Sequence, residues 1–404
     1  MKYDVIIVGG GPAGSTAAKF LSEKGFKTLI IDKCKFPRKK PCGGAIPTRL
    51  LDRFEYLKDT DLLESYSYGG VAYSPSLKYK LELIEEKPIA AMVLRKKFDN
   101  GLLRIAESSG TIVKEGTKVV DIKVTDNNAK VYLNNGSSID SRIVIGADGV
   151  WSTVAKKTGL RAKNKWLAVS VLKEYKLKKA TVDKLFGDDR CCYIYVRFKN
   201  ILGYGWIFPK NEHLNIGIGS IIRSSNYTNI NVNLLESFKD FLDTLKKQKL
   251  VPKNLKSHRI EGGALPTYPL EKTYGKRVIL LGDAAGLINP ITCEGIYYAM
   301  SSGEIGANVV TNALESNNTS ESFLAKYQKS WRKDFGDDFD LLLKSVKAEK
   351  KPSSEDFFKN VSKDKKLSGI LIKILIGQTG IKENKWKIGK RLILSSFKSH
   401  FYKN

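Results

Sequence analysis

The feature that most constrains the fold is a glycine-rich turn at residues 9–14, which read Gly-Gly-Gly-Pro-Ala-Gly. An apolar run at residues 5–8 precedes this turn and has the length of a short buried strand. A helical pattern at residues 17–24 follows it, and a second apolar run, Thr28–Ile31, comes next. A strand, a glycine-rich turn, a helix and a strand in this order predict a β-α-β unit with parallel strands.

The glycines of the turn have the GxGxxG spacing of a Rossmann-type dinucleotide site. Gly9 permits the tight turn, Gly11 lets the backbone approach a pyrophosphate, and Gly14 lets the helix pack closely on the strand. Ala13 lies in the same turn, before the helix whose N-terminus faces the phosphates, and is a further expected cofactor contact. Asp32 ends the second strand, where an acidic side chain hydrogen-bonds ribose hydroxyls. An ordinary glycine turn would need neither the flanking elements nor Asp32, so we expect a dinucleotide cofactor.

Two later segments carry further glycine and aspartate motifs. Residues 145–149 read Ile-Gly-Ala-Asp-Gly, and residues 281–286 read Leu-Gly-Asp-Ala-Ala-Gly. Both resemble motifs of the flavin hydroxylase and reductase superfamily, although Ala155 stands where that superfamily often has Arg. The resemblance implies FAD as the cofactor, with Asp148 in contact with it and Asp283 accepting a hydrogen bond from its ribityl chain.

The same resemblance implies cofactor contacts at other positions. Gly295 and Ile296 would open a helix toward the isoalloxazine ring, where its N-terminus suits the negative charge of the reduced flavin. Arg95, just before a helix predicted over residues 98–108, resembles the Arg that contacts the flavin ribityl or phosphate region, and a solvated Arg at a helix start is the alternative. Val119, in a strand-rich stretch, completes the expected contacts.

The sequence holds one GxGxxG fingerprint and offers no second Rossmann site for NAD(P)H. We therefore expect a transiently bound electron donor. This donor is either a ferredoxin-like protein or NAD(P)H that docks without such a site.

Two segments narrow the resemblance to the geranylgeranyl reductase family. Residues 40–47 read Lys-Pro-Cys-Gly-Gly-Ala-Ile-Pro and resemble that family's cysteine-glycine-glycine loop. Residues 204–210 read Tyr-Gly-Trp-Ile-Phe-Pro-Lys and resemble its aromatic segment. The run at residues 282–295 resembles its second FAD motif, although Cys293 occupies a place often held by Gly or Ser. The resemblance implies reduction of isolated double bonds of geranylgeranyl chains on membrane lipids, on geranylgeranyl diphosphate or on a chlorophyll-type substrate.

Reduction of an isolated alkene needs a hydride at one carbon and a proton at the other. An apolar pocket with aromatic faces suits both a prenyl chain and the positive charge that develops on it. Tyr204 and Trp206 lie two residues apart on a predicted strand and face the same side, as a pocket wall or as ordinary core aromatics. Cys42, with Gly43 and Gly44 beside the flavin, is the expected proton donor or alkene-positioning residue, and a small buried hydrophobe is its alternative.

The charge balance points to an anionic partner. The formal net charge is +27, and residues 361–404 alone carry eleven Lys and Arg against two Asp and Glu. Apolar residues alternate with these cations in a pattern typical of amphipathic helices on an anionic membrane. A solvated basic face and a helical cap over the substrate tunnel are the alternatives. We expect a cytoplasmic, peripherally membrane-associated protein that binds no nucleic acid.

Cysteine usage and the start of the chain agree with this compartment. The five cysteines show neither a CxxC pair nor zinc spacing, so we expect a reducing environment and no metal. A strand is predicted at residues 3–8, so we expect no signal peptide before it. No apolar run reaches the ~18 residues that a bilayer requires.

The motifs predict an α/β fold that resembles para-hydroxybenzoate hydroxylase. It consists of a Rossmann-type FAD-binding domain (residues 1–66, 95–165 and 268–315), an inserted β-rich substrate domain (67–94 and 166–267) and a basic helical C-terminal region (316–404). Two rival functions stay open. One is a flavin monooxygenase or halogenase on the same scaffold, although the halogenase signature WxWxIP does not occur. The other is a prenyl-binding protein without redox turnover, such as the Rab escort and dissociation-inhibitor proteins.

Overall fold

A computed structural model of the chain describes residues 3–161, 167–222, 233–347 and 354–401. Contacts group the chain into two compact units, each assembled from three stretches. The first unit comprises Met1–Lys40, Arg95–Leu167 and Leu265–Phe339. The second comprises Pro41–Leu94, Ala168–Ala264 and Asp340–Asn404.

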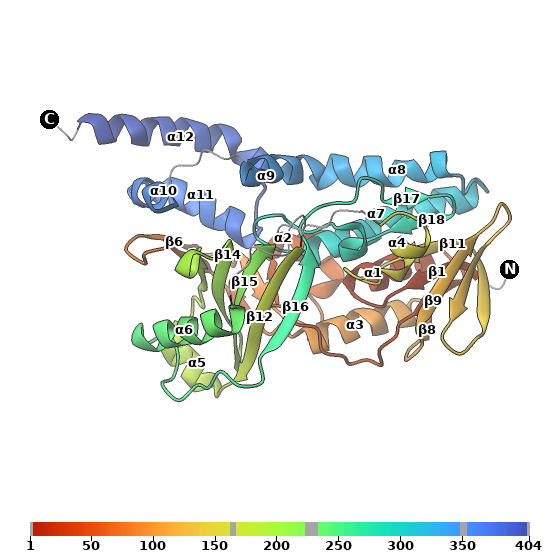
Figure 1. Ribbon diagram of the computed structural model, residues 1–404, viewed down its shortest axis with the longest axis horizontal. Helices are drawn as coiled ribbons and strands as arrows, with labels where there is room; N and C mark the ends of the chain where they lie inside the picture. The colour runs from red at the N-terminus through yellow and green to blue at the C-terminus, as the bar shows by residue number, and fades with distance from the viewer. Residues whose placement is uncertain (1–2, 162–166, 223–232, 348–353, 402–404) are drawn as a thin grey trace. The chain divides into compact units, whose positions relative to one another are not determined.

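The first unit is built on a mostly parallel sheet with the strand order β17-β18-β11-β1-β2-β8. Figure 1 labels β1, β11 and β18 of this sheet. Its strands are β1 (Tyr3–Val8), β2 (Thr28–Ile31), β8 (Ile112–Lys114), β11 (Ser138–Gly146), β17 (Tyr274–Gly275) and β18 (Val278–Leu280). β1 pairs in parallel with β2 and β11, so the predicted β-α-β unit is confirmed. Val5, Ile6 and Ile7 are fully buried, because a parallel sheet is covered on both faces.

A hairpin extends this sheet at β11. β9 (Val119–Val124) pairs antiparallel with β10 (Ala129–Leu133), and β10 pairs antiparallel with β11. The turn between β10 and β11 contains Asn135 and Gly136, and Gly136 has a φ of +85°. An Asn-Gly dipeptide between two β-rich stretches predicts such a hairpin from the sequence, and the structure confirms it.

The helices of the first unit pack against this sheet. They are α1 (Pro12–Glu23), α3 (Arg95–Ser108), α4 (Thr153–Lys157), η4 (Gly282–Ala285), α7 (Ile296–Glu315), α8 (Glu321–Trp331) and η5 (Arg332–Gly336). α1 contacts both α3 and α7. α1 begins at Pro12, earlier than the predicted start at residue 17, because proline fits the first helical position, where no N–H donor is needed. α3 likewise begins at Arg95 rather than at residue 98.

The second unit contains a seven-stranded sheet with the order β16-β12-β15-β14-β13-β5-β6. Its strands are β5 (Gly69–Tyr73), β6 (Lys80–Ile84), β12 (Leu167–Lys176), β13 (Cys192–Val196), β14 (Gly203–Pro209), β15 (His213–Ile222) and β16 (Glu261–Pro266). The sequence predicts paired strands at residues 203–209 and 213–219 joined by the Lys210-Asn211 turn, and the antiparallel pairing of β14 and β15 confirms them. The buried aromatics Phe238 and Phe241 of α6 (Leu234–Lys247) join the core of this sheet, together with Val182 and Phe186 of α5 (Lys179–Phe186).

A small sheet also belongs to the second unit. β3 (Ala45–Pro47) and β4 (Ser65–Ser67) both pair with β7 (Ala90–Met92), and the short helices α2 (Thr48–Arg53) and η1 (Glu55–Leu57) follow β3. The sequence places residues 41–66 with the FAD-binding domain, whereas these pairings group them with the second unit. Strands of three residues with partners far along the chain leave no periodic pattern that local reasoning can detect.

The C-terminal helices complete the second unit. They are α10 (Ser354–Val361), α11 (Lys365–Ile376) and α12 (Ile381–Phe401), and they follow α9 (Asp337–Lys347). α11 covers β5 and β6. Gly70 of β5 leaves room for it, because a Cβ atom there would lie 2.8 Å from Ile372 and 2.7 Å from Ile376. The predicted C-terminal region 316–404 is therefore divided between the units. No helix in the described ranges is long and apolar enough to cross a membrane.

Candidate functional site

The glycine-rich turn leads from β1 into α1 in the first unit. Gly9 has a φ of +106°, and a Cβ atom there would lie 2.3 Å from the Ala147 carbonyl oxygen. A Cβ atom at Gly14 would lie 1.9 Å from the Gly9 carbonyl oxygen, so these two positions require glycine. At Gly11 the nearest atom to an added Cβ is Nη2 of Arg38, at 3.4 Å. The backbone at Gly11 therefore faces a guanidinium group rather than packed backbone.

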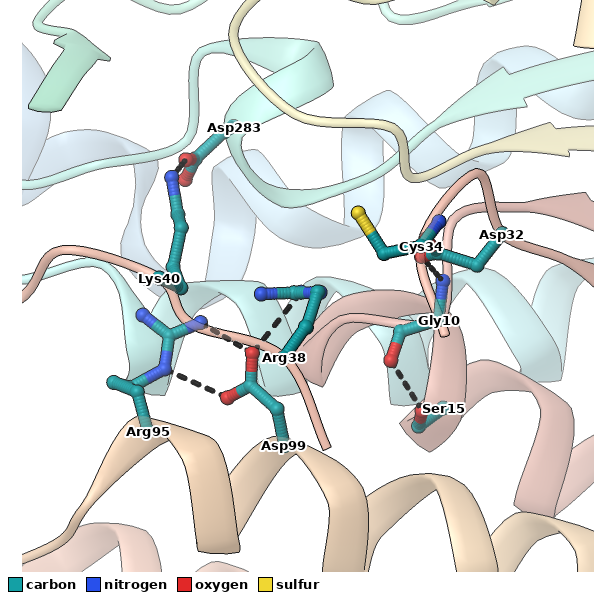
Figure 2. A network of polar contacts seen from close by, with 9 residues as sticks. All are labelled: Gly10, Ser15, Asp32, Cys34, Arg38, Lys40, Arg95, Asp99 and Asp283. Atoms are coloured by element: carbon teal, nitrogen blue, oxygen red, sulfur yellow. Dashed lines mark hydrogen bonds and ion pairs between the residues drawn. The ribbon is translucent and has the colours of Figure 1, made fainter. Parts of the chain in front are cut away.

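Asp32 at the end of β2 ties the glycine turn to the sheet (Figure 2). Its Oδ2 accepts a hydrogen bond from the Gly10 N–H at 2.8 Å, and its Oδ1 accepts one from the Cys34 N–H at 2.8 Å. Ser15 donates its hydroxyl to the Gly10 carbonyl at 3.0 Å and fixes the other side of the turn. The partners of Asp32 in the structure are thus backbone amides, and each carboxylate oxygen keeps a second lone pair for the predicted ribose contact.

Cationic side chains gather on Asp99, a fully buried residue of α3. Arg95 donates to both carboxylate oxygens of Asp99, at 2.7 and 2.8 Å, and Arg38 Nη2 lies 3.1 Å from Asp99 Oδ2. Figure 2 shows both guanidinium groups pointing toward this carboxylate. The arrangement leaves an excess of positive charge beside the start of α1, which is the charge that a pyrophosphate requires.

Sequence reasoning identified Arg95 but did not identify Arg38. Arg38 lies in a loop without periodicity, and no pattern in that loop separates it from its neighbouring lysines. The available signal was the spacing of Arg95 and Asp99, which places a carboxylate one helical turn after a cation.

The glycine and aspartate motif at residues 281–286, together with the start of α7, packs directly on the glycine-rich turn at residues 9–14. A Cβ atom at Gly282 would lie 3.2 Å from the Cβ of Ala13, and one at Gly303 of α7 would lie 2.5 Å from the Ala13 carbonyl oxygen. Gly295 is the N-cap residue of α7, and an added Cβ there would lie 3.8 Å from Asp283 Oδ1. The structure therefore brings Ala13, Asp283, Gly295 and Ile296, the first residue of α7, to neighbouring helix starts.

Lys40 links this motif to the loop that follows β2. Its Nζ lies 3.9 Å from Asp283 Oδ2, and in Figure 2 the two groups point toward each other. The loop that carries Arg38 and Lys40 thus runs from the start of α1 to the start of α7.

Asp148 makes its described contacts within its own turn. Its carboxylate accepts hydrogen bonds from the Ser152 hydroxyl and from the backbone N–H groups of Thr153, at 2.6 Å, and Val154, at 3.2 Å. Burial raises the pKa of Asp148, and these hydrogen bonds oppose the increase. Asp148 therefore caps the start of α4, and a cofactor contact from this residue stays a prediction.

Val119 begins β9 and is buried. Two residues before it, the backbone N–H of Thr117 donates to the Asp32 carbonyl oxygen at 2.9 Å. This bond holds the start of β9 at the end of β2, on the same side as the glycine turn.

A second group of predicted residues meets in the second unit. Tyr204, Trp206 and Phe208 alternate along β14, with ring centroids 5.8 Å apart for the first pair and 6.3 Å for the second. They share one face of the strand, as the sequence predicts for the first two. Gly217 of β15 pairs with Trp206, and its missing side chain makes room for the indole, which would lie 2.1 Å from an added Cβ.

The Cys42–Gly44 segment lies against this aromatic face. A Cβ atom at Gly43 would lie 2.7 Å from the Phe208 ring and 3.3 Å from Trp206 Nε1. Gly44 has a φ of +74°, and its carbonyl accepts a hydrogen bond from the Val93 N–H at 2.7 Å. The structure thus brings together the two segments that carry the predicted catalytic residues, and it adds Phe208, which the sequence reasoning did not single out.

Three of the other cysteines lie where the protonated thiol is favoured. Burial raises the pKa of Cys191 to about 11 and that of Cys192 and Cys293 to about 12. Cys192 belongs to the core between the sheet and the C-terminal helices. Among the described residues, no three His, Cys, Asp or Glu side chains gather into a cluster that could hold a metal ion.

The family model described as FAD binding domain matches residues 2–332. The chain is 33% identical over 338 residues to a digeranylgeranylglycerophospholipid reductase of Methanocaldococcus jannaschii, with 82% of each chain covered. It is similar to the crystal structure of a geranylgeranyl bacteriochlorophyll reductase-like protein from Thermoplasma acidophilum, with a TM-score of 0.77 and 26% identity over 95% of this chain and 98% of that one. A flavin-dependent brominase shares the fold, with a TM-score of 0.73 and 19% identity over 100% of both chains.

These findings confirm the predicted fold class and the predicted resemblance to geranylgeranyl reductases. The motifs that carried the prediction all lie within the matched residues, including the aromatic segment and the cysteine-glycine-glycine segment. The chain belongs to the FAD-binding domain family and, within it, to the family of the digeranylgeranylglycerophospholipid reductases.

Proposed function

We propose that the chain is an FAD-dependent reductase that saturates isolated double bonds in the geranylgeranyl chains of a membrane lipid. The single observation that carries this proposal is the packing of the Cys42–Gly44 segment on the aromatic face of β14. A thiol-bearing loop on an apolar, π-rich surface suits an alkene that must receive a proton. The relatives that carry the name digeranylgeranylglycerophospholipid reductase support a lipid substrate over a free diphosphate or a chlorophyll-type molecule.

The first unit fits FAD by its shape and charge. The backbone at Gly11 and the start of α1 would hold the pyrophosphate, with Arg38 and Arg95 as counter-charges. Asp32 would hold a ribose, and Asp283 with the start of α7 would hold the ribityl chain and the ring edge. When bound, FAD supplies the hydride that alkene reduction requires.

The second unit supplies the substrate surface in this proposal. Trp206 and Tyr204 hold the prenyl chain by apolar contact, and their ring faces stabilise positive charge on the alkene carbon. Cys42 holds a proton at Sγ for the other carbon. The sequence joins this loop to the cation cluster of the first unit through Pro41, which lies between Lys40 and Cys42.

The C-terminal helices favour peripheral attachment to an anionic membrane. Ile372 and Ile376 of α11 pack against Gly70 of β5, so this proposal assigns the membrane-facing role to α12. On α12, Trp386 has an exposed fraction of 82%. The lysines exposed beside it are Lys382, Lys385, Lys387 and Lys390. Lysines around an exposed Trp suit a headgroup region that carries negative charge.

The electron donor in this proposal is a ferredoxin-like protein or NAD(P)H. The single GxGxxG fingerprint supports a donor that binds transiently. A redox-inactive protein of ferredoxin type should compete with a protein donor but not with the much smaller NAD(P)H, so this competition distinguishes the two donors.

The test is product mass. Purified protein loaded with FAD is photoreduced without oxygen and given a digeranylgeranyl glycerophospholipid, and the lipid is analysed by mass spectrometry. The proposal predicts a gain of two hydrogen atoms for each double bond that is lost. A gain of oxygen on readmission of air, without saturation, would instead identify a monooxygenase, and an unchanged lipid bound at one equivalent would identify a carrier.

A further inference from the structure

A buried polar network lies behind the Cys42–Gly44 segment in the second unit. Its centre is Asn215 of β15, whose side chain is fully buried. Asn215 Oδ1 accepts a hydrogen bond from Trp206 Nε1 at 2.8 Å. Its Nδ2 donates to the Cys42 carbonyl oxygen at 3.0 Å and to Glu174 Oε2 at 3.0 Å. One amide group therefore connects the thiol-bearing loop with the aromatic face.

The chemistry of the three partners fixes the orientation of this amide. An indole N–H can only donate, and a backbone carbonyl and a carboxylate can only accept. If the amide were rotated by half a turn, its oxygen would face two acceptors and its NH₂ group would face a donor. The orientation that the structure contains is the one in which all three hydrogen bonds form.

An ion pair supports the outer side of the amide. Glu174 Oε2 also accepts from Lys210 Nζ, at 2.8 Å, and the Lys210 side chain is only 1% exposed. The backbone of Lys210 is itself fixed, because its N–H donates to the His213 carbonyl at 2.8 Å and its carbonyl accepts from Arg190 at 2.6 Å. The Glu174 oxygen that receives Asn215 is therefore held from the opposite side by a buried cation.

The network also contacts the loop at a second position. A Cβ atom at Gly44 would lie 2.9 Å from Lys210 Nζ. The loop thus rests on Asn215 at Cys42 and on the Lys210 ammonium at Gly44. Asn215 lies on β15, Glu174 lies on the neighbouring strand β12, and Lys210 directly follows β14.

We propose that Asn215 is a positioning residue that sets the separation between the Cys42 backbone and the Trp206 indole, and that the Lys210–Glu174 pair holds Asn215 in its required orientation. The proposal rests on the proposed function, in which the thiol and the aromatic face act on one alkene. A displacement of about 1 Å can cost on the order of 10²-fold in rate, so a fixed separation has catalytic value.

The test uses Asn215→Asp in the full-length, FAD-loaded protein. Aspartate has the same shape and keeps an acceptor for Trp206, but it loses both N–H donors and sets an oxygen against the Cys42 carbonyl and Glu174. We expect kcat for the geranylgeranyl lipid to fall by about 10- to 100-fold, with KM changed by less than about 3-fold, because position rather than apolar contact is lost.

Thiol labelling supplies a readout that does not depend on catalysis. Native protein is treated briefly with iodoacetamide, and the label on Cys42 is measured against that on Cys34, a partly exposed cysteine of the first unit. We expect the Cys42-to-Cys34 ratio to rise at least about 3-fold in Asn215→Asp, because the loop is no longer tied. Asn254→Asp, the same change at an exposed asparagine of the second unit, should leave both the ratio and kcat at wild-type values.

A second variant covers the case in which Asn215→Asp does not fold. Asn215→Ser removes the reach to Cys42 without adding charge, and it should change the ratio in the same direction. Wild-type labelling and wild-type kcat in a folded Asn215 variant would overturn the proposal. A raised labelling ratio in a protein that reduces no geranylgeranyl lipid would support the positioning role and reject the proposed function instead.

Discussion

Replacing Asp99 with Asn tests the charge arrangement that we assign to the pyrophosphate site. Asp99 is fully buried and is the shared partner of Arg95 and Arg38, whose side chains are 10% and 17% exposed. Removing one partner of a buried pair costs about 3–5 kcal/mol. Because both guanidinium groups keep some contact with solvent, we take the lower end, about 3 kcal/mol. For a unit of this size, that loss lowers Tm by roughly 6–12 °C.

The same variant should respond unequally to the cofactor. The phosphates of FAD bring negative charge to the guanidinium groups, so the FAD-loaded variant should lose less stability than the apoprotein. Differential scanning calorimetry of both forms measures this difference. The control is Asp126→Asn, which removes a carboxylate of the same unit that is 89% exposed and pairs with Lys276. Equal losses in the two forms, or a loss no larger than that of the control, would refute the assignment of this cluster to the pyrophosphate.

Three further predictions follow from single features of the structure. Asp32→Ala should weaken FAD retention by about 1–3 kcal/mol, measured by fluorescence titration, because it removes a charged acceptor and releases the Gly10 N–H; retention equal to wild type would remove Asp32 from the site. Deletion of α12 should weaken flotation with anionic liposomes and abolish its salt sensitivity, while neutral liposomes serve as the control; unchanged flotation would place attachment elsewhere. Cys191 and Cys192 should resist alkylation at pH 8 in native protein, because a thiol whose pKa is raised stays protonated below that pKa and only the thiolate reacts; rapid labelling of these two, read by peptide mass spectrometry, would contradict their burial.

The parts of the fold that sequence reasoning predicted are those with strong local patterns. The strand at residues 5–8, the GxGxxG turn and the strand Thr28–Ile31 form one continuous signal, and the structure contains the parallel pair β1 and β2. The hairpins at Asn135 and after Pro209 carry turn residues between alternating strands. Local propensity and tertiary packing agree at these places, so a short window of sequence is enough.

The parts that escaped prediction depend on contacts between distant segments. Residues 41–66 contain strands of three residues, and their partner β7 comes after β5 and β6 in the chain. The apolar residues of α11 are compatible in the sequence with either a membrane face or a cap, and the structure packs Ile372 and Ile376 against Gly70 of β5. A glycine that makes room for a helix far along the chain gives no periodic signal of its own.

The residues of the candidate site fall into the same two groups, those that local patterns predict and those that depend on distant contacts. Gly9, Gly14 and Trp206 are found through motifs, because each position needs one particular residue type for a local reason. Arg38 and Asn215 become evident only in three dimensions, where one meets Asp99 and the other meets Cys42. A polar residue inside a strand is common in sequences, and its buried partners alone distinguish it.

The most direct test of the account is single-turnover oxidation of the photoreduced, FAD-loaded protein by a geranylgeranyl lipid without oxygen. The account predicts that flavin absorbance returns with lipid alone, that Cys42→Ser slows this return by about 10²- to 10⁴-fold while FAD stays bound, and that Trp206→Ala weakens lipid binding. A wild-type rate in Cys42→Ser would assign the proton to another source. A wild-type protein that the lipid does not reoxidise, although oxygen does, would contradict the account.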